Sequence, residues 1–100
     1  MNSQEIAELA MWTARAIYDA FKAEGVNLPA ADENLIATFV QRMLEDWQRG
    51  FVIDEKHMLQ LTKEFEKNSK KLSPEVMHVL RVFVEKFPEF VAENTNAVKV

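Results

Sequence analysis

Two glycines and three prolines constrain the fold of this chain most, because the segments between them carry apolar residues at helical spacing. No segment shows the strict apolar-polar alternation of a strand, and no Asn-Gly or Asp-Gly pair marks a hairpin turn. The first segment predicts a helix that has its N-cap at Ser3 and runs to about Glu24. Gly25 is then expected to take the left-handed conformation that closes a helix.

The next segment predicts a second helix, which begins between Pro29 and Asp32 and continues to Arg49, where Gly50 ends it. Its apolar residues fall on one half of a helical wheel: Leu35, Ile36, Phe39, Val40, Met43, Leu44 and Trp47. This helix is therefore expected to bury one face.

Capping signals predict the third and fourth helices. Asp54 is a good N-cap for a helix that reaches roughly Ser69, and this helix is the most polar of the set, so we expect it on the outside. Ser73 and Pro74 form the strongest helix start in the chain, an N-cap serine followed by a first-position proline. The helix that follows carries an apolar stripe: Val76, Val79, Leu80, Phe83, Val84 and Phe87.

Pro88 interrupts the last apolar run, because a proline cannot continue an unbroken helix without kinking it. We therefore predict an all-α fold, a compact bundle of four main helices plus a short C-terminal helix after Pro88. Residues 1–93 are expected to form a single helical domain, and residues 94–100 a frayed tail. Phe90 and Val91 cap the bundle if Pro88 turns the chain back, and form an exposed patch if the segment projects.

The charge of the chain is acidic overall and uneven along it. The formal net charge is −4, which disfavours nucleic acid as a partner because that affinity comes largely from Lys and Arg. Residues 1–55 hold 10 acids and 4 bases, whereas residues 56–100 hold 6 acids and 8 bases. A lysine cluster at Lys63, Lys67, Lys70 and Lys71 is either a solvated helix face or a modest basic patch.

The sequence contains no Cys, so disulfides, thiolate metal sites and cysteine nucleophiles are excluded. Nothing demands an oxidising compartment, and a cytoplasmic location is expected. No apolar run approaches the roughly 20 residues of a membrane-spanning helix, so no membrane partner is predicted.

Residues suited to catalysis are sparse. His57 and His78 lie in different predicted helices and belong to no His-Glu-x-x-His pair, and two glycines are too few for a phosphate-cradling loop. We therefore expect no catalytic residue, no metal, no cofactor and no small-molecule substrate, and a protein that is not an enzyme. A small enzyme whose site assembles from residues distant in sequence is an alternative.

The first predicted helix has an apolar arc too wide for one buried face. Met11 and Tyr18 lie well round the helical wheel from the main apolar side, and Trp12 sits at its polar edge. Such a helix is either central in the fold or covered by another molecule. Aromatic residues and Met are enriched at binding surfaces, which suits the second of these placements.

These patterns favour a non-enzymatic interaction module, a regulator or inhibitor that binds another protein or protein complex, with a homodimer as one form of that binding. The side chains expected to contact the partner are Met11, Trp12, Tyr18, Met77, Val82, Phe87, Phe90 and Val91. A DNA-binding transcriptional regulator is the alternative, with residues 35–69 as a helix-turn-helix. Against it, the recognition helix would start with Asp54 and Glu55, whose charges would face phosphates.

Overall fold

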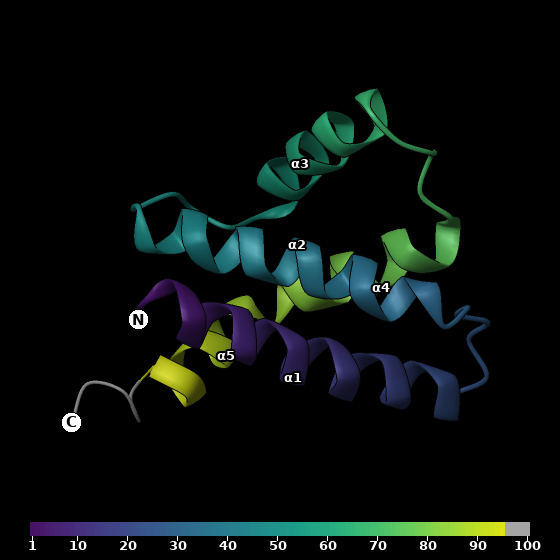
Figure 1. Ribbon diagram of the computed structural model, residues 1–100, viewed down its shortest axis with the longest axis horizontal. Coiled ribbons are helices and arrows are strands. Elements are labelled where there is room, and N and C mark those ends of the chain that lie inside the picture. The colour runs from purple at the N-terminus through teal and green to yellow at the C-terminus, as the bar shows by residue number, and fades with distance from the viewer. Residues whose placement is uncertain (96–100) are drawn as a thin grey trace.

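The computed structural model describes residues 1–95, which form five α-helices and no strand (Figure 1). In chain order these are α1 (Ser3–Ala23), α2 (Ala31–Gln48), α3 (Glu55–Lys67), α4 (Pro74–Glu85) and α5 (Phe87–Thr95). The predicted all-α bundle of four main helices and a short C-terminal one is confirmed.

The N-cap of α1 is Asn2, so the prediction of Ser3 is wrong by one residue. The Asn2 side chain accepts a hydrogen bond from the Glu5 backbone N–H at 2.9 Å, and the Glu5 carboxylate accepts one from the Asn2 N–H at 3.0 Å. This reciprocal pair satisfies two backbone donors at the start of the helix. Ser3 cannot form such a pair, because Ile6 stands three residues after it.

The predicted caps of α3 and α4 are confirmed. Asp54 accepts a hydrogen bond from the His57 N–H at 2.8 Å, and the Ser73 hydroxyl accepts one from the Val76 N–H at 3.2 Å. Each bond satisfies a backbone donor that the first turn of a helix leaves without a partner. α3 ends at Lys67, two residues before the predicted end at Ser69.

Glycine closes both α1 and α2, as predicted. Gly25 has φ +88° and Gly50 has φ +95°, in the left-handed region that glycine enters without a side-chain clash. After Gly25, the N–H of Val26 donates to the Phe21 carbonyl five residues earlier at 3.0 Å, and the same pattern follows Gly50. These bonds satisfy carbonyls at each helix end and turn the chain sharply.

The last helix begins at Phe87, so Pro88 lies in its first turn, where a missing N–H costs no hydrogen bond. The predicted tail was placed from residue 94 onward, but α5 continues to Thr95. Residues 96–100 of that predicted tail lie outside the described residues.

Beyond Pro88 the chain turns back onto the bundle. Phe90 and Val91 are half-buried and pack against the core. The Phe90 ring lies 5.2 Å from the Phe83 ring and 6.1 Å from the Phe87 ring, between ring centroids. Of the two placements that the sequence left open, the one in which this segment caps the bundle is therefore observed.

α2 is the central helix of the bundle. α1 runs antiparallel to it along one side, α3 lies on the opposite side, and α4 passes behind (Figure 1). Its buried residues are Ile36, Phe39, Val40, Met43, Leu44 and Asp46. α1 therefore lies at the edge of the fold, and the central placement considered for it is wrong.

α1 contacts α2 through a narrow line of small side chains. Its buried residues are Ile6, Ala10 and Ala14, which are spaced by one turn of helix. Alanine lets two helices approach closely, because the distance between helix axes depends on the side chains at the contact. Leu9 and Ile17 are half-buried along the flank of α1.

One carboxylate is buried where α2 ends. The Asp46 side chain, 3% exposed, accepts hydrogen bonds from Arg42 Nε at 3.1 and 3.2 Å and lies 2.8 Å from His57 Nε2. Arg49 Nη1 approaches it at 3.7 Å. A buried charge is costly unless well-placed partners surround it. This cluster therefore fixes the end of α2 against the start of α3.

We predict that Asp46→Ala lowers the free energy of unfolding by about 2–3 kcal/mol, because it removes charge-assisted hydrogen bonds at a buried site. Urea denaturation followed by circular dichroism measures the change. Glu45→Ala is the matched control, since the Glu45 side chain makes no ion pair among residues 1–95, and its effect should stay within about 0.5 kcal/mol. Equal effects of the two substitutions would contradict a structural role for the cluster.

Candidate functional site

Large apolar side chains are exposed at two places in the described structure. On α1, Trp12 is 80% exposed and Met11 is 65% exposed. In the connection between α2 and α3, Val52 is 75% exposed and Phe51 is 54% exposed. Isolated exposed apolar residues are common in proteins, so the surroundings of each pair decide whether it forms a binding surface.

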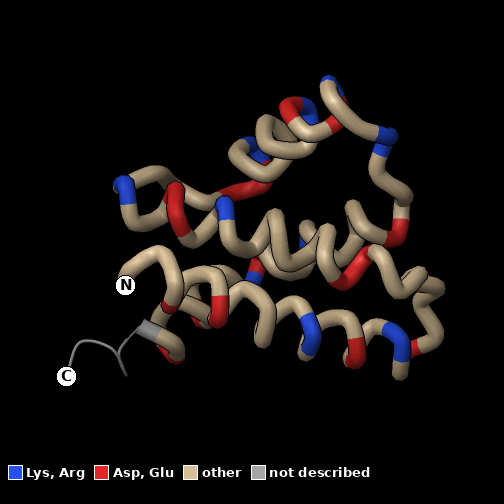
Figure 2. The backbone as a smooth tube through the Cα atoms, in the orientation of Figure 1, with Lys and Arg blue, Asp and Glu red and all other residues tan. Residues whose placement is uncertain are grey.

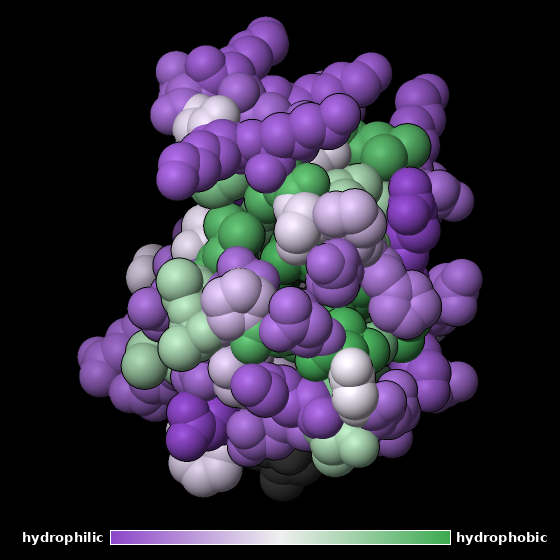
Figure 3. Space-filling view, turned by 90° about the vertical axis from the view of Figure 1, so that its right-hand side faces the viewer, coloured by the Kyte–Doolittle hydropathy of each residue, from purple (hydrophilic) through white to green (hydrophobic). Residues whose placement is uncertain are grey.

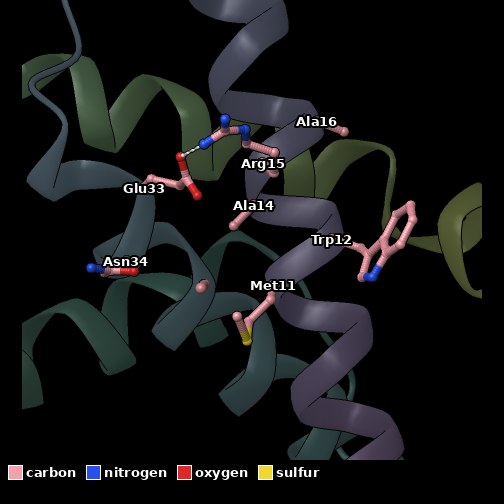
Figure 4. Close-up of a pocket in the computed structure, with 8 residues that line it drawn as sticks. Met11, Trp12, Ala14, Arg15, Ala16, Glu33 and Asn34 are labelled. Carbon is pink, nitrogen blue, oxygen red and sulfur yellow. Dashed lines mark hydrogen bonds and ion pairs between the residues drawn. The ribbon is translucent and has the colours of Figure 1, made fainter.

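The burial of two alanines explains why Trp12 faces solvent. Trp12 lies two residues from both Ala10 and Ala14, which is about 200° round a helix from each of them. A helix that buries both alanines against α2 must therefore point Trp12 away from the core. Met11 leans toward α2 and Trp12 projects on the opposite side of α1 (Figure 4).

A hollow of about 460 Å³ lies between α1 and α2, and we call it the α1–α2 hollow. Its lining residues are Met11, Trp12, Ala14, Arg15, Ala16, Glu33, Asn34 and Ala37. Arg15 Nη1 donates a hydrogen bond to Glu33 Oε1 at 2.8 Å, which bridges the two helices (Figure 4). This bond raises the pKa of Arg15 above its ordinary value.

Two further hollows lie on the other flank of α1, with volumes of about 570 and 370 Å³. Both are lined by Thr13, Ala16, Ile17 and Phe90, so they join into one surface, which we call the α1–α5 groove. It continues past Trp12 toward the start of α1, and along Val82 of α4 toward the end of α1. Trp12 and Ala16 line both the α1–α2 hollow and this groove, so Trp12 forms the ridge between them.

Of the eight side chains predicted to contact a partner, the structure brings Trp12, Val82 and Phe90 together along the α1–α5 groove, whereas Met11 lines the α1–α2 hollow on the other flank of α1. Met11 and Trp12 are exposed on α1, while Val82 and Phe90 are half-buried. The three groove residues come from three different helices. Their proximity depends on the tertiary packing of α4 and α5 along the flank of α1.

Phe87, also predicted at the partner surface, is 3% exposed and belongs to the core, so its inclusion is wrong. Its ring contacts those of Trp47 and Phe83, with centroids at 6.5 and 5.6 Å. The first turn of α5 directs this side chain inward.

The three remaining predicted residues lie apart from the exposed pair on α1. Tyr18 is half-buried, and its hydroxyl donates a hydrogen bond to the Leu28 carbonyl at 3.0 Å. Met77 lies one turn before Arg81, whose guanidinium pairs with Glu55 of α3 at 3.5 Å, so it is on the side of α4 toward α3. Val91 is half-buried and packs against the core.

Phe51 and Val52 were not among the residues predicted to contact a partner, although the structure exposes both. The sequence itself indicates that part of this segment is exposed, because three consecutive apolar residues in a short extended segment cannot all point to the same side. Only Ile53 is buried. The Phe51 ring lies 5.9 Å from the His57 ring, close to the Asp46 cluster, and no hollow that we describe is lined by this pair.

The residues of the helix-turn-helix alternative form α2, α3 and their connection. One face of α3 is exposed and carries Lys56, Gln60, Lys63 and Lys67. Figure 2 shows several basic positions along α3. The three acids of α3 interact with residues outside this face. Glu55 pairs with Arg81 at 3.5 Å, Glu64 pairs with Arg42 at 3.7 Å, and Glu66 accepts a hydrogen bond from the Leu72 N–H at 2.8 Å. DNA binding through this face stays a prediction.

A third region joins the starts of α2 and α4. A hollow of about 520 Å³ is lined there by residues of both helix starts and by Lys70 and Lys71. Figure 3 faces this end of the molecule and shows hydrophobic side chains between hydrophilic ones. Burial raises the pKa of Asp32 in this region, and the charge of Glu75 adds to that shift.

The described residues contain no group of three or more His, Cys, Asp or Glu that could hold a metal ion. The closest contact between titratable groups of the kind used in acid-base chemistry is His57 to Asp46, at 2.8 Å. His57 Nε2 is committed to this carboxylate, and the cluster joins two helices. Its supported role is therefore structural.

Because folding raises the pKa of Asp32, the folded state binds its proton more tightly than the unfolded state does. The protonated Asp32 carboxyl therefore contributes its full stabilisation at pH values below the pKa of Asp32 in the unfolded state. That stabilisation is lost as pH rises through the pKa of Asp32 in the folded state. We predict that the free energy of unfolding of Asp32→Asn falls relative to that of the unsubstituted protein as pH decreases from above the folded-state pKa of Asp32 to below its unfolded-state pKa. Urea denaturation at several pH values measures the difference, and a difference that is constant with pH would contradict the shift.

Among the described helices, none has both the length and the hydropathy needed to cross a membrane. The chain matches no protein-family model, and neither a curated protein nor a solved structure is significantly similar to it.

Proposed function

We propose that this protein is a non-enzymatic interaction module that binds another protein through the outer face of α1 and thereby regulates or inhibits that partner. The observation that carries the proposal is the 80% exposure of Trp12, which forms a ridge between the α1–α2 hollow and the α1–α5 groove. The side chain is large and apolar, and its position is fixed by a helix whose opposite face is buried.

The area of Trp12 makes it a strong contact for a partner. A tryptophan side chain offers roughly 150–250 Å² for burial. Removing four-fifths of that area from water contributes about 4 kcal/mol at 25 cal/mol per Å², before the cost of association is subtracted. Tryptophan is also among the residues that most often dominate the energetics of protein interfaces.

The surroundings of Trp12 have the composition of an interface rather than of an isolated exposed residue. Met11 and Ala16 extend the apolar surface on either side, and hollows adjoin it on both flanks. The Arg15–Glu33 ion pair and the Glu8 carboxylate provide a polar rim. An apolar centre with a polar border is the usual organisation of a protein-binding surface.

Removing an aromatic side chain should change the free energy of unfolding little at an exposed position and strongly at a buried one. Trp12→Ala should change the free energy of unfolding by less than about 0.5 kcal/mol, because the side chain is mostly solvated in the free protein. Phe83→Ala, at a buried position, should lower it by about 3–4 kcal/mol. Guanidinium denaturation measures both, and a large loss for Trp12→Ala would place that residue in the stabilising core instead.

Site-specific photo-crosslinking tests the binding surface directly. A photo-reactive phenylalanine analogue replaces Trp12 in one variant and Val52 in the control, which is a similarly exposed apolar position outside the grooves. Both variants are made in cells that naturally produce the protein. We expect a discrete adduct with a second protein from position 12 and none from position 52.

The mass of the adduct distinguishes the forms of the proposal. An adduct with a different protein supports binding to another macromolecule, and an adduct of two copies of this chain supports the homodimer. The absence of any adduct at position 12, or equal labelling at both positions, would reject α1 as the binding face.

A further inference from the structure

We infer that the α1–α5 groove receives a basic amphipathic helix of the partner protein. This inference rests on the proposed function and adds the chemistry of the occupant. It is carried by the length of the groove, the small side chains along its floor, and the sign of the charge at one end.

The groove has the dimensions of a helix. Along α1 and its C-cap the lining residues extend from Glu5 to Glu24, a stretch of 20 residues that spans about 28 Å at the helical rise. Thr13, Ala16 and Ala20 are small and line it at helical spacing, so an incoming helix can approach α1 closely. Trp12 and Phe90 provide large apolar contacts at its sides.

A helical occupant fits this surface better than an extended one. The described elements that line the groove are all helices, whose backbone hydrogen bonds are made internally. An extended segment would find no strand edge there to pair with its own N–H and C=O groups. A helix satisfies those groups within itself and presents one apolar face, which is the part that the groove would cover.

The charge around one end of the groove selects a basic partner. Glu5 and Glu8 line that end, and Glu93 is exposed on α5 next to Asn94, which also lines it. Neither residues 1–14 nor residues 87–95 contain Lys or Arg, and acidic residues mark both segments (Figure 2). At the other end, Lys86 lies with Glu24 and offsets it. The basic residues of the occupant should therefore lie at the end near the start of α1.

A second copy of this chain does not supply such a helix. Among the described helices, most of the lysines lie on α3, which exposes Lys56, Lys63 and Lys67, and α1 contributes only Lys22. The apolar residues of α3 that are buried in its own core include Met58 and Leu61. α3 could present a basic and apolar surface only by leaving the fold, so a different protein is the better source of the occupant.

Two designed peptides test the inference in solution. One is a 20-residue amphipathic helix of Leu and Lys, and the other has Glu in place of every Lys. Isothermal titration calorimetry at low salt measures their affinity for the intact protein. We expect the Leu/Lys peptide to bind at least about tenfold more tightly, because its charges oppose those of the groove rim.

Matched variants separate the groove from the net charge of the protein. Glu8→Lys combined with Glu93→Lys should weaken binding of the Leu/Lys peptide by about tenfold. Glu55→Lys combined with Glu64→Lys makes the same change in net charge on α3 and should leave the affinity within about twofold. Trp12→Ala should weaken binding of the Leu/Lys peptide by about tenfold or more, because this side chain lines the groove.

The outcomes distinguish this inference from the proposed function. Equal affinities of the two peptides, equal effects of the two double variants, or no binding of the Leu/Lys peptide would overturn the basic helix as occupant. If photo-crosslinking at position 12 still gives an adduct in that case, the outer face of α1 remains a binding surface with a different partner chemistry. If crosslinking at position 12 also fails, both are rejected.

Discussion

The contact between α1 and α2 through Ala10 and Ala14 determines the arrangement of the surface described here. These alanines are almost fully buried, and the side chain two positions from both of them must point outward. That side chain is Trp12, so one close helix contact produces both the edge position of α1 and its exposed ridge. α4 and α5 then cover one flank of α1 without covering the ridge itself.

The Asp46 cluster performs a separate task at the other face of α2. It holds the start of α3 by linking Asp46 to His57, while Arg42 spans from Asp46 to Glu64 further along α3. α3 is thereby fixed with its lysines outward. The fold thus separates an apolar, partly acidic surface on α1 and α5 from a lysine-bearing surface on α3, and the first of these supports the proposed binding site.

Local signals were sufficient to predict most of the fold. The caps at Asp54 and Ser73 and the helix stops at Gly25 and Gly50 depend on residues only a few positions apart, and each was predicted. The apolar stripe that includes Phe87 did indicate its burial, so the prediction of Phe87 at the partner surface went against that pattern. What the stripe could not show is that Phe87 begins α5 rather than ending α4. The contact of Asp46 with His57 also depends on the path of the connection between two helices.

The order of the helices along the chain has a kinetic consequence. α1 and α2 are neighbours in sequence and pair through a short connection, so their contact closes a small loop and is expected to form early. α5 comes last among the described helices, and it forms one wall of the groove. During synthesis the flank of α1 would therefore stay open after the first helical pair has formed, and the groove would be complete only when the final wall docks.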